Sequence, residues 1–350
     1  MKLTLTNVSI FIRKYGPVFI LFVLAFFIIY YSVKIGIIIY EARKGPEIYY
    51  NPIFGVINKP NIKSSTSSAN LNFSIDTIEG KPTTSTSSAN VYLIPPPETK
   101  FGYRNRLFVM AENFGFLNPT SNYKLNEKNA EFDDEMQTLK IDITNFNFSY
   151  RYFYENDNTL FEFTQSPVTK EAINETVTFL NALGKHSPEF KNAQIKSKYY
   201  YYDKDNKTLT QVYKNLDANL IEIYFIKPNL DTLPFVSDYY PDSQNYTKLV
   251  STVDGYKIVE SQMKFFDKSI ENFGVYPVMT GDEAYKLLKK GEGKVLHYSP
   301  LSKKIIIKKM YLAYFDPKEY EEYLQPVYVF EGSNDFVAFI PAIIKEYLAE

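Results

Sequence analysis

The feature that most constrains this chain is an apolar run close to its N-terminus. No charged residue interrupts residues 17–33, PVFILFVLAFFIIYYSV, and after Lys34 the apolar character continues to Tyr40. A helix over residues 17–40 would be roughly 36 Å long, which is enough to cross a hydrocarbon core of ~30 Å with some tilt. We therefore predict a transmembrane helix over residues 17–40, preceded by a short cytoplasmic N-terminus over residues 1–16.

Side chains within the run suit a membrane anchor. Lys34 lies near the end of the run, so its ammonium can reach the headgroups, and tyrosines favour the interface. The predicted anchor residues are Pro17, Phe22, Phe26, Tyr30, Tyr31, Lys34 and Tyr40. A cleaved signal peptide and a buried core helix are the alternatives, but no small-x-small cleavage site follows the apolar core. No later run approaches about 18 apolar residues, which predicts a single-pass protein.

The flanking charges predict an orientation. Lys2, Arg13 and Lys14 precede the run, whereas Arg43 and Lys44 on its other side are accompanied by glutamates. Basic residues are retained on the cytoplasmic side, so we expect the N-terminus in the cytoplasm. The chain from about residue 46 onward would then lie outside the cytoplasm, in the cell envelope. The expected partners are the lipid bilayer and an unidentified envelope protein.

Charge balance and the scarcity of reactive side chains exclude several function classes. The chain has 39 Lys plus Arg against 40 Asp plus Glu, so no global positive field draws it to nucleic acid. The absence of cysteine excludes disulfides, thiolate metal sites and cysteine nucleophiles. The two histidines, His186 and His297, have no partner that the sequence identifies, and no phosphate-binding or nucleophile motif occurs. We predict no cofactor, no metal site and no catalytic residue.

Beyond the anchor, helical patterns alternate with groups of strand-like runs. A proline-containing linker over residues 41–62 leads away from the membrane. The folded region is predicted to divide into residues 63–165, with Ser/Thr-rich strands and a first α+β unit, residues 166–275, and residues 276–350. Segregated helices and meandering strands favour an α+β fold over a doubly wound sheet. The predicted fold class is thus α+β, a single transmembrane helix followed by repeated helix-plus-antiparallel-sheet units.

Two local patterns make sharper predictions. Thr280 and Glu283 form a capping box, in which the hydroxyl and the carboxylate each accept a backbone N–H, and this predicts the start of a helix. Before that, apolar residues alternate on odd numbers up to Ile143 and on even numbers from Phe146. Because a shift of one residue exchanges the faces of a strand, we expect a bulge or bend near Thr144.

The tyrosine run Tyr199, Tyr200, Tyr201 and Tyr202 is the candidate binding face. In a strand, the first and third side chains share one face, and the second and fourth share the other. An exposed aromatic face would stack on sugar rings or bind a peptide. The competing interpretation is an ordinary strand with one face in the core.

The C-terminal segment resembles a known family. The runs that carry the resemblance are YPVMTGDEAY (276–285), IIIKKMYLAYF (305–315), YLQPVYVFEG (323–332) and FVAFIPA (336–342). They are similar to the closing unit of PepSY-like domains, as in the YycH/YycI accessory regulators of envelope-sensing histidine kinases, and to uncharacterised membrane-anchored proteins of AT-rich bacteria. The resemblance covers about a fifth of the chain. It implies a helix packed on strands and an extracytoplasmic, single-pass protein that works by contact, with no catalytic residues to transfer.

Three functions remain open from sequence. The leading hypothesis is a non-catalytic, membrane-anchored extracytoplasmic protein that acts by protein–protein contact, in regulation or envelope assembly. The first alternative is a surface module that binds glycan or peptide through tyrosine faces. The second is an envelope hydrolase with a pair of carboxylates brought together by the fold, which would need one carboxyl with a raised pKa.

Overall fold

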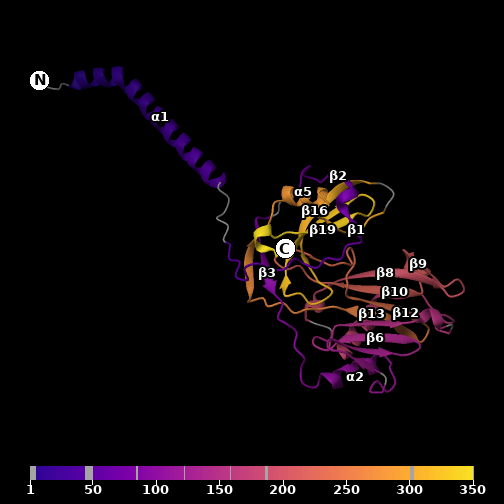
Figure 1. Ribbon diagram of the computed structural model, residues 1–350. Helices are drawn as coiled ribbons and strands as arrows, with labels where there is room; N and C mark the ends of the chain where they lie inside the picture. Colours follow the sequence, from indigo (N-terminus) through magenta and orange to yellow (C-terminus); the bar gives the residue numbers. More distant parts are fainter. Residues whose placement is uncertain are drawn as a thin grey trace. The chain divides into compact units, whose positions relative to one another are not determined.

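The structure, a computed structural model, describes residues 5–43, 50–83, 86–121, 123–157, 159–185, 188–299 and 303–349. The chain divides into two compact units, Met1–Tyr49 and Tyr50–Glu350 (Figure 1). All strands of the described residues belong to the second unit.

The first unit is a single long helix, α1 (Leu5–Arg43). Its stretch Arg13–Ile38 is apolar and long enough to cross a membrane, and none of that stretch is buried. An apolar helix without buried side chains is what lipid contact requires, whereas a core helix would be covered by protein. Pro17 lies inside the helix. The chain therefore has one N-terminal apolar helix of membrane-spanning length.

The largest element of the second unit is a nine-stranded sheet in which every neighbouring pair is antiparallel (Figure 1). In spatial order its strands are β4 (Tyr123–Leu125), β5 (Asn129–Asp133), β6 (Gln137–Asp142), β7 (Phe148–Tyr152), β13 (Gly255–Met263), β12 (Tyr246–Thr252), β10 (Leu220–Ile226), β8 (Gln194–Asp203) and β9 (Thr208–Val212). Helices α3 (Thr169–Ala182) and α4 (Pro188–Lys191) lie between β7 and β8 in the sequence. Strands that precede these helices and strands that follow them therefore belong to one sheet.

One face of this sheet is covered by α2 (Tyr103–Asn113), α3 and α4. Phe114, just after α2, packs against Phe148 and Tyr150 of β7 and against Phe179 of α3. The alternation along β7 explains this face, because Phe148, Tyr150 and Tyr152 are buried while Arg151 between them is exposed. The largest apolar core of the protein lies between these helices and the sheet.

A second, seven-stranded sheet combines the two ends of the unit. Its path is β1 (Thr66–Ser67), β15 (Lys294–His297), β19 (Val337–Pro341), β18 (Pro326–Gly332), β16 (Lys304–Phe315) and β11 (Phe235–Val236), with β2 (Asn72–Ile75) also paired to β16. Both β2 and β11 run parallel to β16, one along each end of it. Helix α5 (Gly281–Lys289) packs on this sheet through Ala284 and Leu288.

A small third sheet completes the unit: β14 (Phe273–Pro277), β3 (Ser88–Leu93) and β17 (Tyr323–Leu324). The single turns η1 (Ser68–Asn70), η2 (Tyr154–Asn156), η3 (Asn215–Asp217) and η4 (Lys345–Tyr347) lie in the connections. The architecture is therefore mixed α+β, with one N-terminal apolar helix followed by a mostly sheet domain. A helix followed by antiparallel strands recurs along the chain, but the strands of the first two stretches join one sheet.

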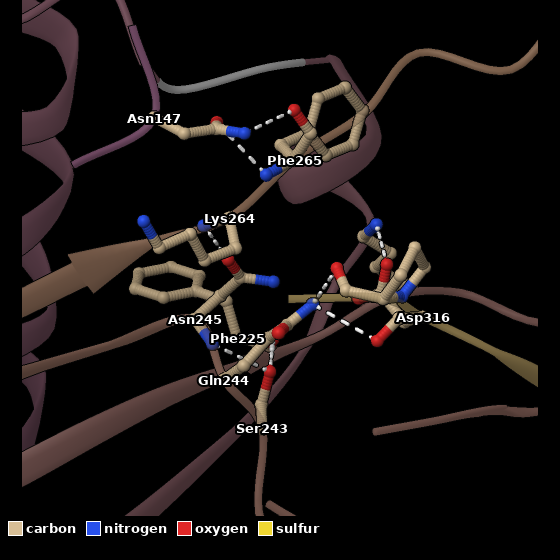
Figure 2. Close-up of polar contacts among 10 residues, drawn as sticks. Asn147, Phe225, Ser243, Gln244, Asn245, Lys264, Phe265 and Asp316 are labelled. Atoms are coloured by element: carbon tan, nitrogen blue, oxygen red, sulfur yellow. Dashed lines mark hydrogen bonds and ion pairs between the residues drawn. The ribbon is translucent and has the colours of Figure 1, made fainter. Parts of the chain in front are cut away.

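A buried polar junction connects the two large sheets (Figure 2). The amide of Gln244 donates to the backbone carbonyls of Asp316 and Pro317, which follow β16. The side chain of Asn147 accepts from the backbone N–H of Phe265 and donates to its carbonyl. The Asn147 amide bonds through both its oxygen and its nitrogen, which fixes one register between these segments because leaving either group unpaired would cost roughly 1–3 kcal/mol. The side-chain oxygen of Gln244, by contrast, is buried without a hydrogen-bond partner among the residues that the structure describes.

Lys185 supplies a buried cation beside Asn147. Its ammonium donates to the Asn147 side chain at 3.0 Å and to the backbone carbonyl of Asn145 at 3.1 Å. Burial lowers the pKa of Lys185 to about 7, and the nearby Arg106 adds to the effect. Lys185, which follows α3, thus ties the β6–β7 turn to the helix layer, while the Gln244 bonds join the two large sheets.

The local predictions had different outcomes. The capping box is confirmed, since Thr280 accepts from the Glu283 N–H and the Glu283 carboxylate accepts from the Thr280 N–H. The bulge or bend expected near Thr144 is a bend, the turn of the β6–β7 hairpin. The Asp142 carboxylate accepts from the backbone N–H groups of Thr144 and Asn145, and Phe146 has φ 59°. An aspartate that caps a turn reverses the chain where the pattern alone indicated a continuing strand.

Candidate functional site

The face of the nine-stranded sheet opposite the helices carries charged and hydroxyl side chains. A hollow of about 870 Å³ lies on it, over β4–β7, β13 and β12, and the loop residues Tyr239 and Lys318 contribute to its walls. The charged side chains that line it are Lys124, Glu131, Asp133, Lys140, Arg151, Glu260 and Lys318, together with the tyrosines Tyr239 and Tyr246. Tyr123 and Tyr150 also border the hollow, but their rings pack against Phe108 and Phe114 on the helix side. This hollow is the candidate functional site.

A row of alternating charges crosses the floor of this face. Glu222 on β10, Lys248 on β12, Glu260 on β13 and Arg151 on β7 are successive cross-strand neighbours. The Lys248 ammonium lies 3.0 Å from a Glu260 oxygen and 3.5 Å from a Glu222 oxygen. Burial opposes the charge of Lys248, but the two glutamates outweigh it and raise its pKa. The row is therefore internally neutralised and stabilises the sheet.

Glu260 is held in its ionised form. Burial alone would raise its pKa, but Lys248 and a hydrogen bond from the Tyr246 hydroxyl at 2.6 Å hold the pKa below its usual value. The ring of Tyr246 also lies beside Tyr239, with centroids 6.5 Å apart. Both tyrosines are half-buried and contact one another, so they do not offer a free flat ring.

One end of the hollow is basic. The Lys318 ammonium, at the wall of the hollow, donates to the Tyr239 hydroxyl at 2.8 Å. Lys264 directly follows β13 and lies beside the hollow without lining it. Burial lowers the pKa of Lys264 to about 8, and the charge of Lys318 adds to the effect. Within the described residues, neither ammonium forms an ion pair with a carboxylate, whereas Lys140 is paired with Glu131 at 2.9 Å. The carboxylates of Asp142 and Glu319 lie close enough to Lys264 to raise its pKa, but in the described part of the chain neither forms an ion pair with it.

The carboxyls with raised pKa values lie elsewhere. Burial raises the pKa of Asp238, and burial together with the charge of Asp238 raises the pKa of Glu321 to about 7. Their carboxylates accept backbone N–H groups of Lys63 and Asn61, respectively, at 3.1 Å. Neither lines the hollow. Both carboxyls hold the segment that precedes β1. They therefore do not form a carboxylate pair with Glu260 in the hollow.

The predicted tyrosine face is distributed over two environments on β8. The Tyr199 hydroxyl bonds to that of Thr169 at the start of α3, at 2.7 Å, and Tyr202 is buried at 4% exposure. Tyr200 is half-buried on the charged face, beneath the ammonium of Lys248. Of the four, only Tyr201 is exposed, at 49%.

The remaining candidates contribute little to the site. His186 lies outside the described residues, and His297 is half-buried in β15. Among the described residues, no group of three or more His, Asp or Glu side chains is arranged to hold a metal ion. Sequence reasoning missed the hollow itself, because its side chains come from strands far apart in the chain. The sequence signal that could have found it is the polar residue at every second position of these strands.

Comparisons with known proteins give no function. No protein-family model and no curated protein matches the chain. Among solved structures, the chain is similar to an uncharacterised protein from Eubacterium rectale, with 13% sequence identity and a TM-score of 0.35, over 77% of this chain and 87% of that one. A similarity at this level carries no argument about activity.

Proposed function

We propose that this chain is a single-pass membrane protein whose domain, from about residue 50 onward, lies outside the cytoplasm and binds an acidic segment of an envelope partner protein. The binding site is the hollow, and the partner's carboxylates pair with Lys318 at its wall and with Lys264 beside it. The protein acts by contact, as the resemblance to PepSY-like regulators implies, and not by catalysis.

The observation that carries this proposal is the unmatched basic end of the hollow. Two half-buried ammonium groups without a carboxylate partner are costly to desolvate, and an incoming carboxylate would relieve that cost. Among the other charged groups at this face, Lys140 is already paired with Glu131, and Glu260 with Lys248. The site therefore distinguishes an acidic ligand from a neutral or basic one.

The geometry supports the two alternatives less well. Stacking on sugar needs an accessible ring face, but Tyr239 and Tyr246 contact each other, and of the predicted tyrosine run only Tyr201 is exposed. Glycoside hydrolysis needs a protonated carboxyl near an ionised one. In the hollow the pKa of Glu260 is lowered, and the carboxyls of raised pKa serve as caps for another segment.

Site-specific photo-crosslinking in native membranes, followed by mass spectrometry, tests the proposal. A photoreactive phenylalanine in place of Tyr239, at the wall of the hollow, is expected to give one discrete protein adduct. Lys318→Glu in the same chain is expected to abolish that adduct, whereas Lys345→Glu, on η4 in another part of the domain, is the matched control and leaves it intact. An adduct that survives Lys318→Glu would overturn the assignment of the hollow.

A further inference from the structure

The outer edge of β9 is an unpaired strand edge. One side of β9 pairs with β8, and in the part of the chain that the structure describes no strand pairs with its other side. Residues 208–211 are exposed and Val212 is half-buried. The backbone N–H and C=O groups along that side are therefore available to another strand.

The other sheet edges in the described residues are short, charged, interrupted or covered. On β2, which among these residues pairs only with β16, the Tyr285 hydroxyl donates to the backbone carbonyl of Phe73. Edge strand β4 has three residues and carries Lys124, and β1, β11 and β17 have two residues each. Edge strand β14 contains Pro277, and its Val275 exchanges backbone bonds with Asn51. By contrast β9, with the sequence TLTQV, has neither charge, proline nor glycine. Natural edges use such features to block pairing, so β9 stands apart as an edge left open.

We infer that β9 is a self-association edge, at which a second copy of this chain pairs antiparallel about a two-fold axis at Thr210. In this register Thr208 lies opposite Val212 of the second copy, and Leu209 lies opposite Gln211. The β-branched residues 208, 210 and 212 then meet on one face, and the unbranched pair meets on the other. A two-fold interface requires such self-complementarity, because each copy presents the same surface.

Charge fits the same register. All five paired residues are uncharged, so no like charges lie opposite one another across the axis. The nearest lysines, Lys207 and Lys214, lie just beyond the two ends of the strand. A register centred on Leu209 would place Lys207 opposite Gln211, and one centred on Gln211 would place Lys214 opposite Thr208. Either shift would reduce the number of uncharged residues that pair with each other.

Exposed apolar side chains adjoin this edge. Leu209 is 40% exposed and Tyr213, directly after the strand, is 95% exposed. Tyr201 on β8 is the cross-strand neighbour of Thr210 and shares its face. A second copy would cover part of this surface and turn two nine-stranded sheets into one continuous sheet. The pairing is favoured further by confinement of both copies to one membrane, a contribution that rests on the proposed anchoring.

Disulfide mapping of the full chain in membranes tests the inference, and the absence of native cysteine makes it direct. With a copper–phenanthroline oxidant, Thr210→Cys is expected to form a crosslinked dimer, because residues directly opposite have Cβ atoms about 4.5–5.5 Å apart. Thr208→Cys is expected to crosslink with Val212→Cys when the two variants are co-expressed, and to crosslink poorly with itself. The matched control is Leu216→Cys, which is 74% exposed but lies outside the register.

A second variant separates pairing from folding. Thr210→Lys places two ammonium groups opposite each other at the axis, so it is expected to abolish crosslinking between Thr208→Cys and Val212→Cys while the melting temperature stays unchanged. Equal crosslinking of Thr210→Cys and Leu216→Cys, or persistence of the dimer in the lysine variant, would overturn the inference. These outcomes are independent of the Tyr239 adduct, so the β9 contact and the partner-binding function can fail separately.

Discussion

The ammonium of Lys227 lies 2.7 Å from the carboxylate of Asp316, and the two side chains are only 5% and 7% exposed. Lys227 follows β10 of the nine-stranded sheet, and Asp316 follows β16 of the seven-stranded sheet. The ammonium also lies over the ring of Phe265, 4.7 Å from its centroid. This buried pair therefore joins the two halves of the domain beside the amide junction.

Removing one partner of this pair is expected to be severe. Asp316→Ala leaves the Lys227 charge buried without a counter-ion and should lower the free energy of unfolding by about 3–5 kcal/mol. Glu155→Ala is the matched control, because it breaks the exposed pair with Arg151 and should cost less than about 1 kcal/mol. Urea unfolding of the full chain in detergent measures both. Similar losses for the two variants would contradict the role of the buried pair.

A buried charge in β18 gives a second test. Val329 is fully buried in the core on one side of the seven-stranded sheet, so Val329→Asp should cost more than about 3 kcal/mol. Val253→Asp introduces the same change at a position that is 61% exposed and should change stability by no more than about 0.5 kcal/mol. If the melting temperature of Val329→Asp equals that of the wild type, β18 does not lie where the structure has it.

The capping box predicts a smaller effect. Thr280→Ala removes the hydroxyl that accepts the Glu283 N–H and should cost roughly 0.5–2 kcal/mol. Thr280→Ser keeps a hydroxyl at the same place and should recover most of that loss. The unfolding midpoints of the two variants measure this difference. Equal losses of stability in both would show that the hydroxyl does not stabilise α5.

Glu321 predicts a pH dependence of stability. Burial raises its pKa to about 7 in the folded state, from 4.5. The folded state therefore binds more protons than the unfolded state between these values, and stability falls as the pH rises through this window. Glu321→Gln should flatten that part of the profile and stabilise the protein above pH 7 by up to about 3 kcal/mol. Glu319→Gln, an exposed neighbour, should leave the profile unchanged, and a wild-type profile in the Glu321 variant would refute this account.

The anchor is tested by extraction and labelling. We expect the full chain to stay in the membrane fraction after an alkaline carbonate wash, because α1 has one apolar stretch of spanning length. An introduced cysteine at Leu216 should react with a membrane-impermeant maleimide on intact cells. Recovery of a mature protein that begins near residue 43 would show instead that α1 is a cleaved signal sequence.

Particular residues show how far sequence reasoning reached. The apolar helix and the Thr280 cap were predictable, because each depends on residues that are neighbours in the chain. The turn at Asp142 was not, since the alternation on each side of it fits a bulge as well as a hairpin. The alternation of Tyr199 to Tyr202 between two faces was predicted. Which tyrosines are buried depends on α3 and on the row of alternating charges, and both come from other parts of the chain.

The hollow shows why the site itself could not be predicted. Arg151 and Glu260 are cross-strand neighbours although they lie in separate stretches of the sequence. Lys318 comes from a loop after a strand of the other sheet and reaches Tyr239. Sequence gives the polar side of each strand, but only the order of strands in the sheet shows which polar sides meet.

The central claim is that the hollow binds acidic segments through Lys318 at its wall and Lys264 beside it. It is tested most directly by the binding of a fluorescent glutamate-rich peptide to the full chain in detergent, measured by anisotropy from pH 6 to pH 10. We predict saturable binding that weakens as the pH rises through about 8, where Lys264 loses its proton, and that is lost in Lys318→Glu but retained in Lys345→Glu. Binding that is independent of pH and of Lys318, or a preference for a lysine-rich peptide or a neutral oligosaccharide, would contradict the claim.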